Sequence, residues 1–240
     1  MDVHFISLGY NCWGKMAMKN TQLLVKESLP FDSNITNHIQ EVVDSLHELK
    51  ATRNYQTKFT KINMIGDGPN GVVLVQEKHG MKFCHFFTKA DIAPVIVRNP
   101  NRIENIKPEK NLEICTTFNR RFARLLEYLD SDKVLCFLRL DKEPDPEWET
   151  ELRKLTATLR GFSNPNQYLL YVNRAIDSSM CGVFADTYDI PVFLWNQEFE
   201  GDFCKTYDNR FLTLLSVVKQ AVQDRIHSAS SKHDKSVPPA

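Results

Sequence analysis

Three runs of seven or eight residues in the second half of the chain are apolar along most of their length. They are residues 133–140 (KVLCFLRL), 167–173 (QYLLYVN) and 190–196 (IPVFLWN). A strand takes this form when both faces of its sheet are covered, as in a parallel sheet flanked by helices. Amphipathic patterns predict helices over 118–129, 146–160 and 208–226, between and after these runs. The sequence therefore predicts an α/β fold, with a mostly parallel sheet and helices on both faces.

The first half predicts one more unit of this kind and an insertion. Residues 3–8 (VHFISL) predict a buried strand, and Gly9 allows a turn into a helix over 11–26. Residues 35–49 predict a second amphipathic helix, with Ser33 or Asn34 as N-cap.

Two extended runs, 72–78 and 81–87, flank His79 and Gly80 and predict an inserted β-hairpin. The Pro- and Asn-rich residues 91–117 predict a long surface connection. We expect a single α/β domain over residues 1–227 and a disordered tail over 228–240, because the tail has too few apolar residues to offset its ordering entropy.

Composition excludes several classes of function. The 30 Lys and Arg balance the 30 Asp and Glu without a dense run of one sign, which argues against nucleic acid as a partner. No apolar stretch approaches the roughly 20 residues that span a bilayer, and none resembles a signal peptide. The six cysteines are scattered without a CxxC pair, so we expect reduced thiols, no metal, no cofactor and a cytoplasmic protein.

The segment Gly9-Tyr10-Asn11-Cys12 follows the first predicted strand, and open α/β sheets bind ligands at such strand ends. A thiol at the start of the next helix would have its pKa lowered by the helix dipole. Nearby amides and Asn11 could then stabilise an oxyanion. The alternative is that Cys12 is a small buried hydrophobic residue in a tight turn.

A thiol nucleophile needs a base, and His85 is the best placed of the seven histidines because it lies in an aromatic run. It could equally be a core histidine bonded to the backbone. Asp32 could orient the imidazole or cap the following helix. Arg139 ends a predicted strand, and Arg121 shares a helical face with two other arginines, so either could bind a phosphate or carboxylate if it is not simply solvated.

The segments FISLGYNCWGKMAMK and SLPFDS resemble the opening motifs, SLGxNC and PFDW, of a family of uncharacterised bacterial and viral proteins described as papain-like cysteine peptidases. The matching residues are Ser7, Leu8, Gly9, Asn11 and Cys12, then Pro30, Phe31 and Asp32, then Phe118, Arg120, Arg121, Arg124 and Arg139. Ser33 stands where the family has tryptophan, and His85 where it has a histidine. The resemblance implies Cys12 as nucleophile, His85 as base and Asp32 as a third member.

Two classes of function follow from these residues. The first is a cysteine hydrolase or acyl-transfer enzyme acting on a peptide or a small acyl or amide substrate. The second is a ligand-binding or transferase domain, in which Gly9, Tyr10 and Arg139 recognise a phosphorylated or sugar-like ligand and Cys12 only packs. A third possibility is an interaction module with a vestigial pocket.

Overall fold

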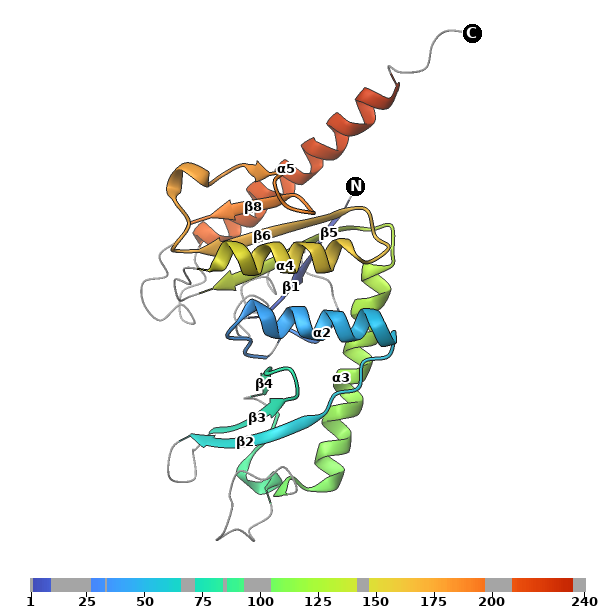
Figure 1. The fold of residues 1–240 in the computed structure, drawn as a ribbon, viewed down its shortest axis with the longest axis vertical. Helices are drawn as coiled ribbons and strands as arrows, with labels where there is room; N and C mark the ends of the chain where they lie inside the picture. The colour runs from blue at the N-terminus through green and yellow to red at the C-terminus, as the bar shows by residue number, and fades with distance from the viewer. Residues whose placement is uncertain are drawn as a thin grey trace.

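The computed structural model describes residues 2–9, 27–32, 34–65, 72–83, 86–92, 105–141, 147–196 and 209–234. The larger sheet contains, in spatial order, β1 (Val3–Ser7), β5 (Val134–Asp141), β6 (Gln167–Asn173), β8 (Val192–Trp195) and β7 (Phe184–Ala185). The smaller sheet contains β2 (Phe59–Ile65), β3 (Val72–Glu77) and β4 (Lys82–Phe83). The described helices are α2 (Ile39–Thr52), α3 (Pro108–Leu129), α4 (Trp148–Arg160) and α5 (Asn209–Asp234), with short 3₁₀ turns at Lys89–Asp91 and Ser178–Met180 (Figure 1).

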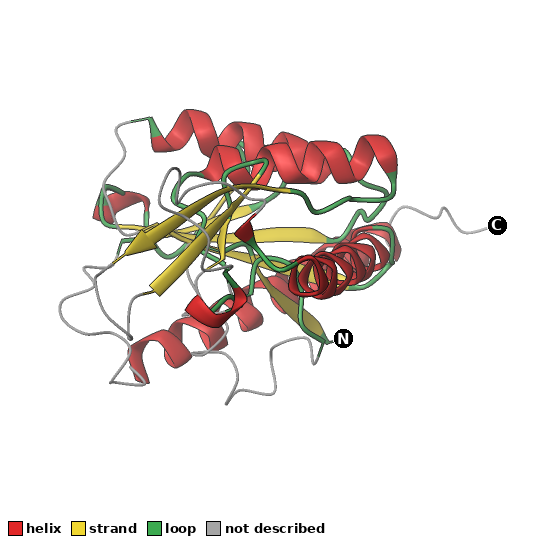
Figure 2. Cartoon of the chain, turned by 90° about the horizontal axis from the view of Figure 1, so that it is seen from below, coloured by secondary structure: helices red, strands yellow, loops and turns green. Residues whose placement is uncertain are grey.

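The larger sheet confirms the predicted α/β class. Strands β1, β5, β6 and β8 are parallel, and only the short edge strand β7 is antiparallel. Alternate side chains enter two cores: Phe137 and Leu169 face α2 and α4, whereas Cys136 and Leu170 face α5. Figure 2 shows helices on both sides of these strands. The period of two along each strand thus places apolar side chains against helices on both faces, as a parallel sheet requires.

Helix α2 buries the predicted stripe but begins four residues later than predicted. Its buried side chains include Ile39, Val42, Val43, Leu46 and Leu49. The N-cap is the extended residue His38, without a side-chain cap, so the prediction of Ser33 or Asn34 as N-cap was wrong. The reason is tertiary: Ile35 pairs with Lys82 of β4 through two backbone hydrogen bonds, both of 2.9 Å, and cannot also be helical.

Helix α3 corrects a second expectation. Residues 91–117 were predicted to form a surface connection, but the helix starts at Pro108, ten residues before the predicted start. Proline is well tolerated in a first helical turn because its missing N–H would have no partner there. Ile114 extends the buried stripe of Phe118, Phe122 and Leu125 by one turn, so packing stabilises the longer helix.

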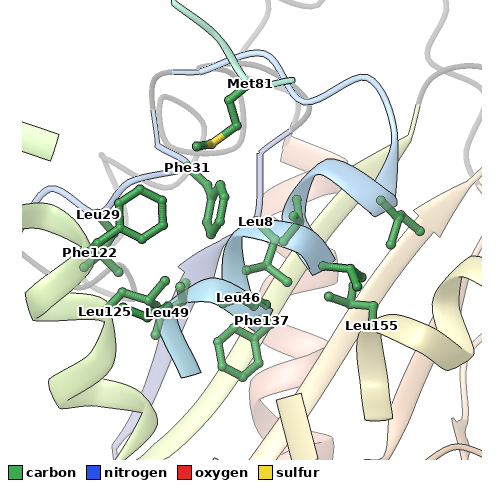
Figure 3. Packing of buried hydrophobic residues seen from close by; sticks show 14 of the residues in the cluster. Leu8, Leu29, Phe31, Leu46, Leu49, Met81, Phe122, Leu125, Phe137 and Leu155 are labelled. Atoms are coloured by element: carbon green, nitrogen blue, oxygen red, sulfur yellow. The ribbon is translucent and has the colours of Figure 1, made fainter. Parts of the chain in front are cut away.

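The predicted hairpin is present as β3 and β4, and an unpredicted strand, β2, pairs with β3 to complete the smaller sheet. Figure 1 shows α2 lying between the two sheets, with α3 running along both. Phe83 of β4 contacts Phe59 of β2 and Phe118 of α3 at ring distances of 5.0 and 4.5 Å. Figure 3 shows Leu8, Phe31 and Met81 gathered in the same apolar cluster. The insertion therefore shares the core of the larger sheet.

Helix α5 crosses one face of the larger sheet and continues beyond it. It extends to Asp234, whereas the sequence predicted an end near residue 226 and a disordered tail from 228. Figure 1 shows its C-terminal end projecting from the body. Residues 235–240 lie outside the described part of the chain. None of the described helices is long and apolar enough to cross a membrane.

Candidate active site

The structure describes half of the predicted site residues. Gly9, Asp32, Arg121 and Arg139 are described, whereas Tyr10, Asn11, Cys12 and His85 lie outside the described residues. The described chain includes residues close to both Cys12 and His85 in sequence. The site can therefore be built from these flanking residues and from the side chains around them.

The end of β1 turns sharply at Gly9. The Leu8 amide donates to the carbonyl of Leu138 at 2.8 Å, which extends the parallel pairing of β1 and β5. Gly9 then has φ +90°, and a Cβ atom there would lie 2.2 Å from Oγ1 of Thr36. Both the left-handed conformation and the contact exclude a side chain. Glycine thus lets the chain leave the sheet beside Thr36, three residues before Cys12.

The segment of residues 34–36 joins this turn to the smaller sheet. Thr36 is fully buried, and its hydroxyl lies 3.5 Å from the carbonyl oxygen of Leu8. Its neighbour Ile35 exchanges backbone hydrogen bonds with Lys82 of β4. A single extended segment therefore contacts the end of β1 on one side and the strand before His85 on the other. We call residues 34–36 the bridging segment.

Arg139 holds the bridging segment against β1. Its Nη1 donates to the carbonyl of Leu8 at 3.1 Å and to Oγ1 of Thr36 at 2.6 Å. Its Nη2 donates to the carbonyl of Thr36 at 3.0 Å and pairs with Asp141 at 2.5 Å. The side chain is 0% exposed. The terminal nitrogens of Arg139 are thus bonded within the protein, which makes the side chain a structural anchor in the described geometry, and its predicted role in ligand binding stays a prediction.

Asp32 lies in a buried turn before the bridging segment. Its Oδ2 accepts the backbone N–H of Leu29 at 2.6 Å, and Nδ2 of Asn34 donates to the carbonyl of Pro30 at 2.7 Å. Because α2 starts at Ile39, Asp32 does not cap that helix. The carboxyl is 1% exposed and close enough to Arg121 to act on its charge. Of the two roles expected for Asp32, the helix cap is thus excluded.

Arg121 of α3 lies beside two aromatic rings that contact each other. Its guanidinium is 4.6 Å from the ring centre of Phe118 and 5.5 Å from that of Phe86. The side chain is half-buried, whereas its neighbour Arg120 is exposed. Burial lowers the pKa of Arg121, and the carboxyl of Asp32 opposes this shift. Arg121 therefore differs from a solvated surface arginine.

Further polar side chains lie at the carboxyl ends of β5 and β6. Burial raises the pKa of Tyr171, whose hydroxyl interacts with Asp141 and accepts a hydrogen bond from Nδ2 of Asn173 at 3.1 Å. Trp148 stacks on Tyr171 at 5.7 Å. The rule that ligands collect at strand ends could have found Tyr171 and Asn173 in the sequence. Thr36, by contrast, has no local sequence signal. In the described part of the chain no group of His, Cys, Asp and Glu side chains could hold a metal ion.

Comparison with known proteins gives one finding. No curated protein and no solved structure matches the chain. A family model described as "Putative papain-like cysteine peptidase (DUF1796)" matches residues 3–165. The match includes β1, the bridging segment, the smaller sheet, Arg121 and Arg139. It confirms the resemblance of the opening motifs. The chain belongs to this family.

Proposed function

We propose that the protein is a cysteine hydrolase that cleaves a peptide or a related amide, with Cys12 as nucleophile and His85 as base. Membership of the family supports the reaction class. The arrangement of the described residues supports the pairing of these two side chains. Asp32 is the proposed orienting carboxylate, and Asn11 the proposed oxyanion donor.

The bridging segment is the observation that carries the proposal. Cys12 follows Gly9 by three residues, and Gly9 contacts Thr36. His85 follows Lys82 by three residues, and Lys82 is hydrogen-bonded to Ile35. Three residues of chain reach at most about 10 Å. These short connections therefore permit Cys12 and His85 to approach each other across the bridging segment.

The proposed reaction proceeds through a thioester. His85 accepts the Sγ proton of Cys12, and the thiolate attacks the carbonyl carbon of the scissile amide. Asn11 and backbone N–H groups stabilise the oxyanion of the tetrahedral intermediate. The intermediate collapses as the C–N bond breaks, and His85 returns the proton to the leaving amine. Water, deprotonated by His85, then hydrolyses the thioester and restores the thiol.

Labelling with a thiol-directed electrophilic probe tests this proposal. A fluorescent peptidyl acyloxymethyl ketone should label the wild-type protein once, and Cys12→Ser and His85→Ala should each abolish this labelling while the circular dichroism spectrum stays unchanged. Cys181→Ser is the matched control, because Cys181 is partly exposed but lies near β8, away from the bridging segment. Equal labelling of wild type and Cys12→Ser would remove the proposal.

A further inference from the structure

A carboxyl group is fully buried at the hairpin turn of the smaller sheet. Glu77, the last residue of β3, is 0% exposed. Its Oε1 lies 2.7 Å from the hydroxyl of Tyr55, and its Oε2 accepts the backbone N–H of His79 at 2.8 Å. The side chains of Lys78 and His79, next to it in the turn, contact Glu48 of α2 instead. Burial away from water favours the neutral form of such a carboxyl.

The surroundings of Glu77 decide its charge state. Tyr55 is 1% exposed, and its ring stacks on Phe122 of α3 at 3.6 Å. Burial raises the pKa of Glu77 and outweighs the hydrogen bonds and the nearby positive charges, which act in the opposite direction. The titratable and charged groups around the Glu77–Tyr55 pair are Glu48 on α2, Lys78 and His79 in the turn, and Cys115 on α3.

The hydrogen bond between Tyr55 and Glu77 can run in either direction. A carboxylate only accepts, so the phenol donates when Glu77 is ionised. A protonated carboxyl can donate to the phenol oxygen while its other oxygen still accepts the N–H of His79. The neutral form thus keeps both contacts. The ionised form keeps them as well but places a charge inside the protein, and opening of the turn to water relieves that cost.

The turn is joined to the bridging segment by backbone hydrogen bonds. The Glu77 amide donates to the carbonyl of Met81 at 2.8 Å, and the Gly80 amide donates to the carbonyl of Glu77 at 2.9 Å. The residue after Met81 is Lys82, which exchanges hydrogen bonds with Ile35. An opening of the turn therefore acts on the bridging segment through the start of β4.

We propose that Glu77 is a pH-sensitive switch, which in its neutral form holds the turn of residues 77–81 closed and which loosens the turn when it loses its proton to water. Because its folded-state pKa is raised, this stabilisation is present below the unfolded value of about 4.3 and is lost as the pH rises through the folded value. Glu48 has a lowered pKa and acts in the opposite direction. The turn should therefore be closed most tightly between the folded pKa values of the two carboxyls. The inference is independent of the reaction proposed for Cys12.

Amide hydrogen exchange of the full chain, followed by NMR, tests the switch. As the pH rises from about 5 to about 8, the protection factor of the Lys82 amide should fall at least about threefold in wild type, since one unit of pKa difference is worth tenfold. Glu77→Gln should remove most of this fall. Glu41→Gln is the matched control and should keep it, because Glu41 is a half-buried carboxyl that lies over Gly80 on the same turn. A protection factor that is independent of pH, or that falls equally in Glu77→Gln, would overturn the switch.

A second measurement needs no variant of Glu77. The carboxyl carbon of Glu77, titrated by NMR in wild type, should have a midpoint above about 4.3. Tyr55→Phe should raise this midpoint further, because the phenol favours the carboxylate. The protection of the Lys82 amide should change over the same pH range as the carbon signal. A midpoint at or below about 4.3, or one that Tyr55→Phe leaves unchanged, would contradict the assignment.

Discussion

Arg139 and Arg121 carry the same cation, but the protein surrounds the two side chains in different ways. Arg139 is fully buried, and its terminal nitrogens contact Leu8, Thr36 and Asp141. Arg121 is half-buried beside two aromatic rings, and its buried Nη1 has no acceptor among the described residues. Both Nη atoms of Arg139 are bonded within the fold and its Nε lacks an acceptor in the described chain, whereas in Arg121 it is a terminal nitrogen, Nη1, that lacks one.

The difference separates an arginine that joins two backbone segments from one that packs beside aromatic rings. Arg139 donates to backbone carbonyls of two segments that are far apart in sequence. It therefore fixes the position of the bridging segment against β1. Its charge is balanced by Asp141. Arg121 fixes no backbone segment through its Nη1. Substitutions of the two residues should therefore differ in their effect on stability.

The largest expected effect is that of Arg139→Met on stability. The substitution removes the contacts to Leu8 and Thr36 and leaves the carboxyl of Asp141 without its cation, which typically costs about 3–5 kcal/mol. Urea unfolding at pH 7 measures the loss. A free energy of unfolding within about 1 kcal/mol of wild type would show that Arg139 is not the anchor of the bridging segment.

Gly9→Ala should have the next largest effect, and Gly182→Ala provides a matched control. The two glycines have nearly equal angles, φ +90° and +87°, so both substitutions incur a similar backbone strain. Only at Gly9 would the new Cβ meet Thr36, at 2.2 Å, whereas nothing lies within 4 Å at Gly182. We expect Gly9→Ala to lose about 1–3 kcal/mol more than Gly182→Ala in urea unfolding. Equal losses would mean that the turn at Gly9 does not pack against Thr36.

A smaller, pH-dependent effect on stability is expected from Glu48 of α2, which contacts the hairpin turn of the smaller sheet. Burial alone would raise the pKa of Glu48 on α2, but hydrogen bonds from Lys78 and His79 outweigh it and lower the pKa. A lowered folded-state pKa gives stability that is present above the unfolded value of about 4.3 and is lost as the pH falls through the folded value.

The variant Glu48→Gln isolates this contribution. It should be less stable than wild type by about 0.5–1 kcal/mol at pH 7, because the ion pairs are partly exposed, and the difference should shrink as the pH falls below about 4. Urea unfolding across this range gives the comparison. A difference that stays constant with pH would show that the ionised form of Glu48 does not hold the hairpin turn against α2.

The smallest expected change is that of Arg121→Met on stability. Methionine keeps an apolar chain against Phe86 and Phe118 and removes the unpaired donor, while it loses a cation–π contact worth about 0.5–1 kcal/mol. These effects oppose each other, so the free energy of unfolding should stay within about 1 kcal/mol of wild type. A loss as large as that of Arg139→Met would make Arg121 a second anchor and remove the contrast between the two residues.

The sequence predicted the parts of the fold that depend on local periodicity. The continuous apolar runs around Phe137, Leu169 and Phe193 correctly predicted parallel strands covered on both faces. The start of α2 could not be predicted in the same way, because Ile35 fits the helical stripe and is withdrawn from it only by pairing with Lys82. That pairing joins residues 47 positions apart and leaves no local signal.

The same distinction applies to the candidate site. The strand-end rule pointed to Gly9 and Arg139 because both lie at the ends of predicted strands, and their part in a site stays a prediction. It could not show that Arg139 would donate hydrogen bonds to Leu8 and Thr36, because Thr36 reaches β1 only through tertiary packing. The pairing of Cys12 with His85 stays a prediction, supported by the bridging segment.

The pH dependence of Cys12 alkylation tests the central claim most directly. Iodoacetamide should modify Cys12 with an apparent thiol pKa well below 8.5, and His85→Gln should move that value upward, because the imidazole stabilises the thiolate. Cys12→Ser supplies the background that is subtracted; burial raises the pKa of Cys115 and Cys136, and Cys181→Ser in both proteins removes the partly exposed thiol. An apparent pKa at or above 8.5 that His85→Gln leaves unchanged would contradict a Cys12–His85 pair.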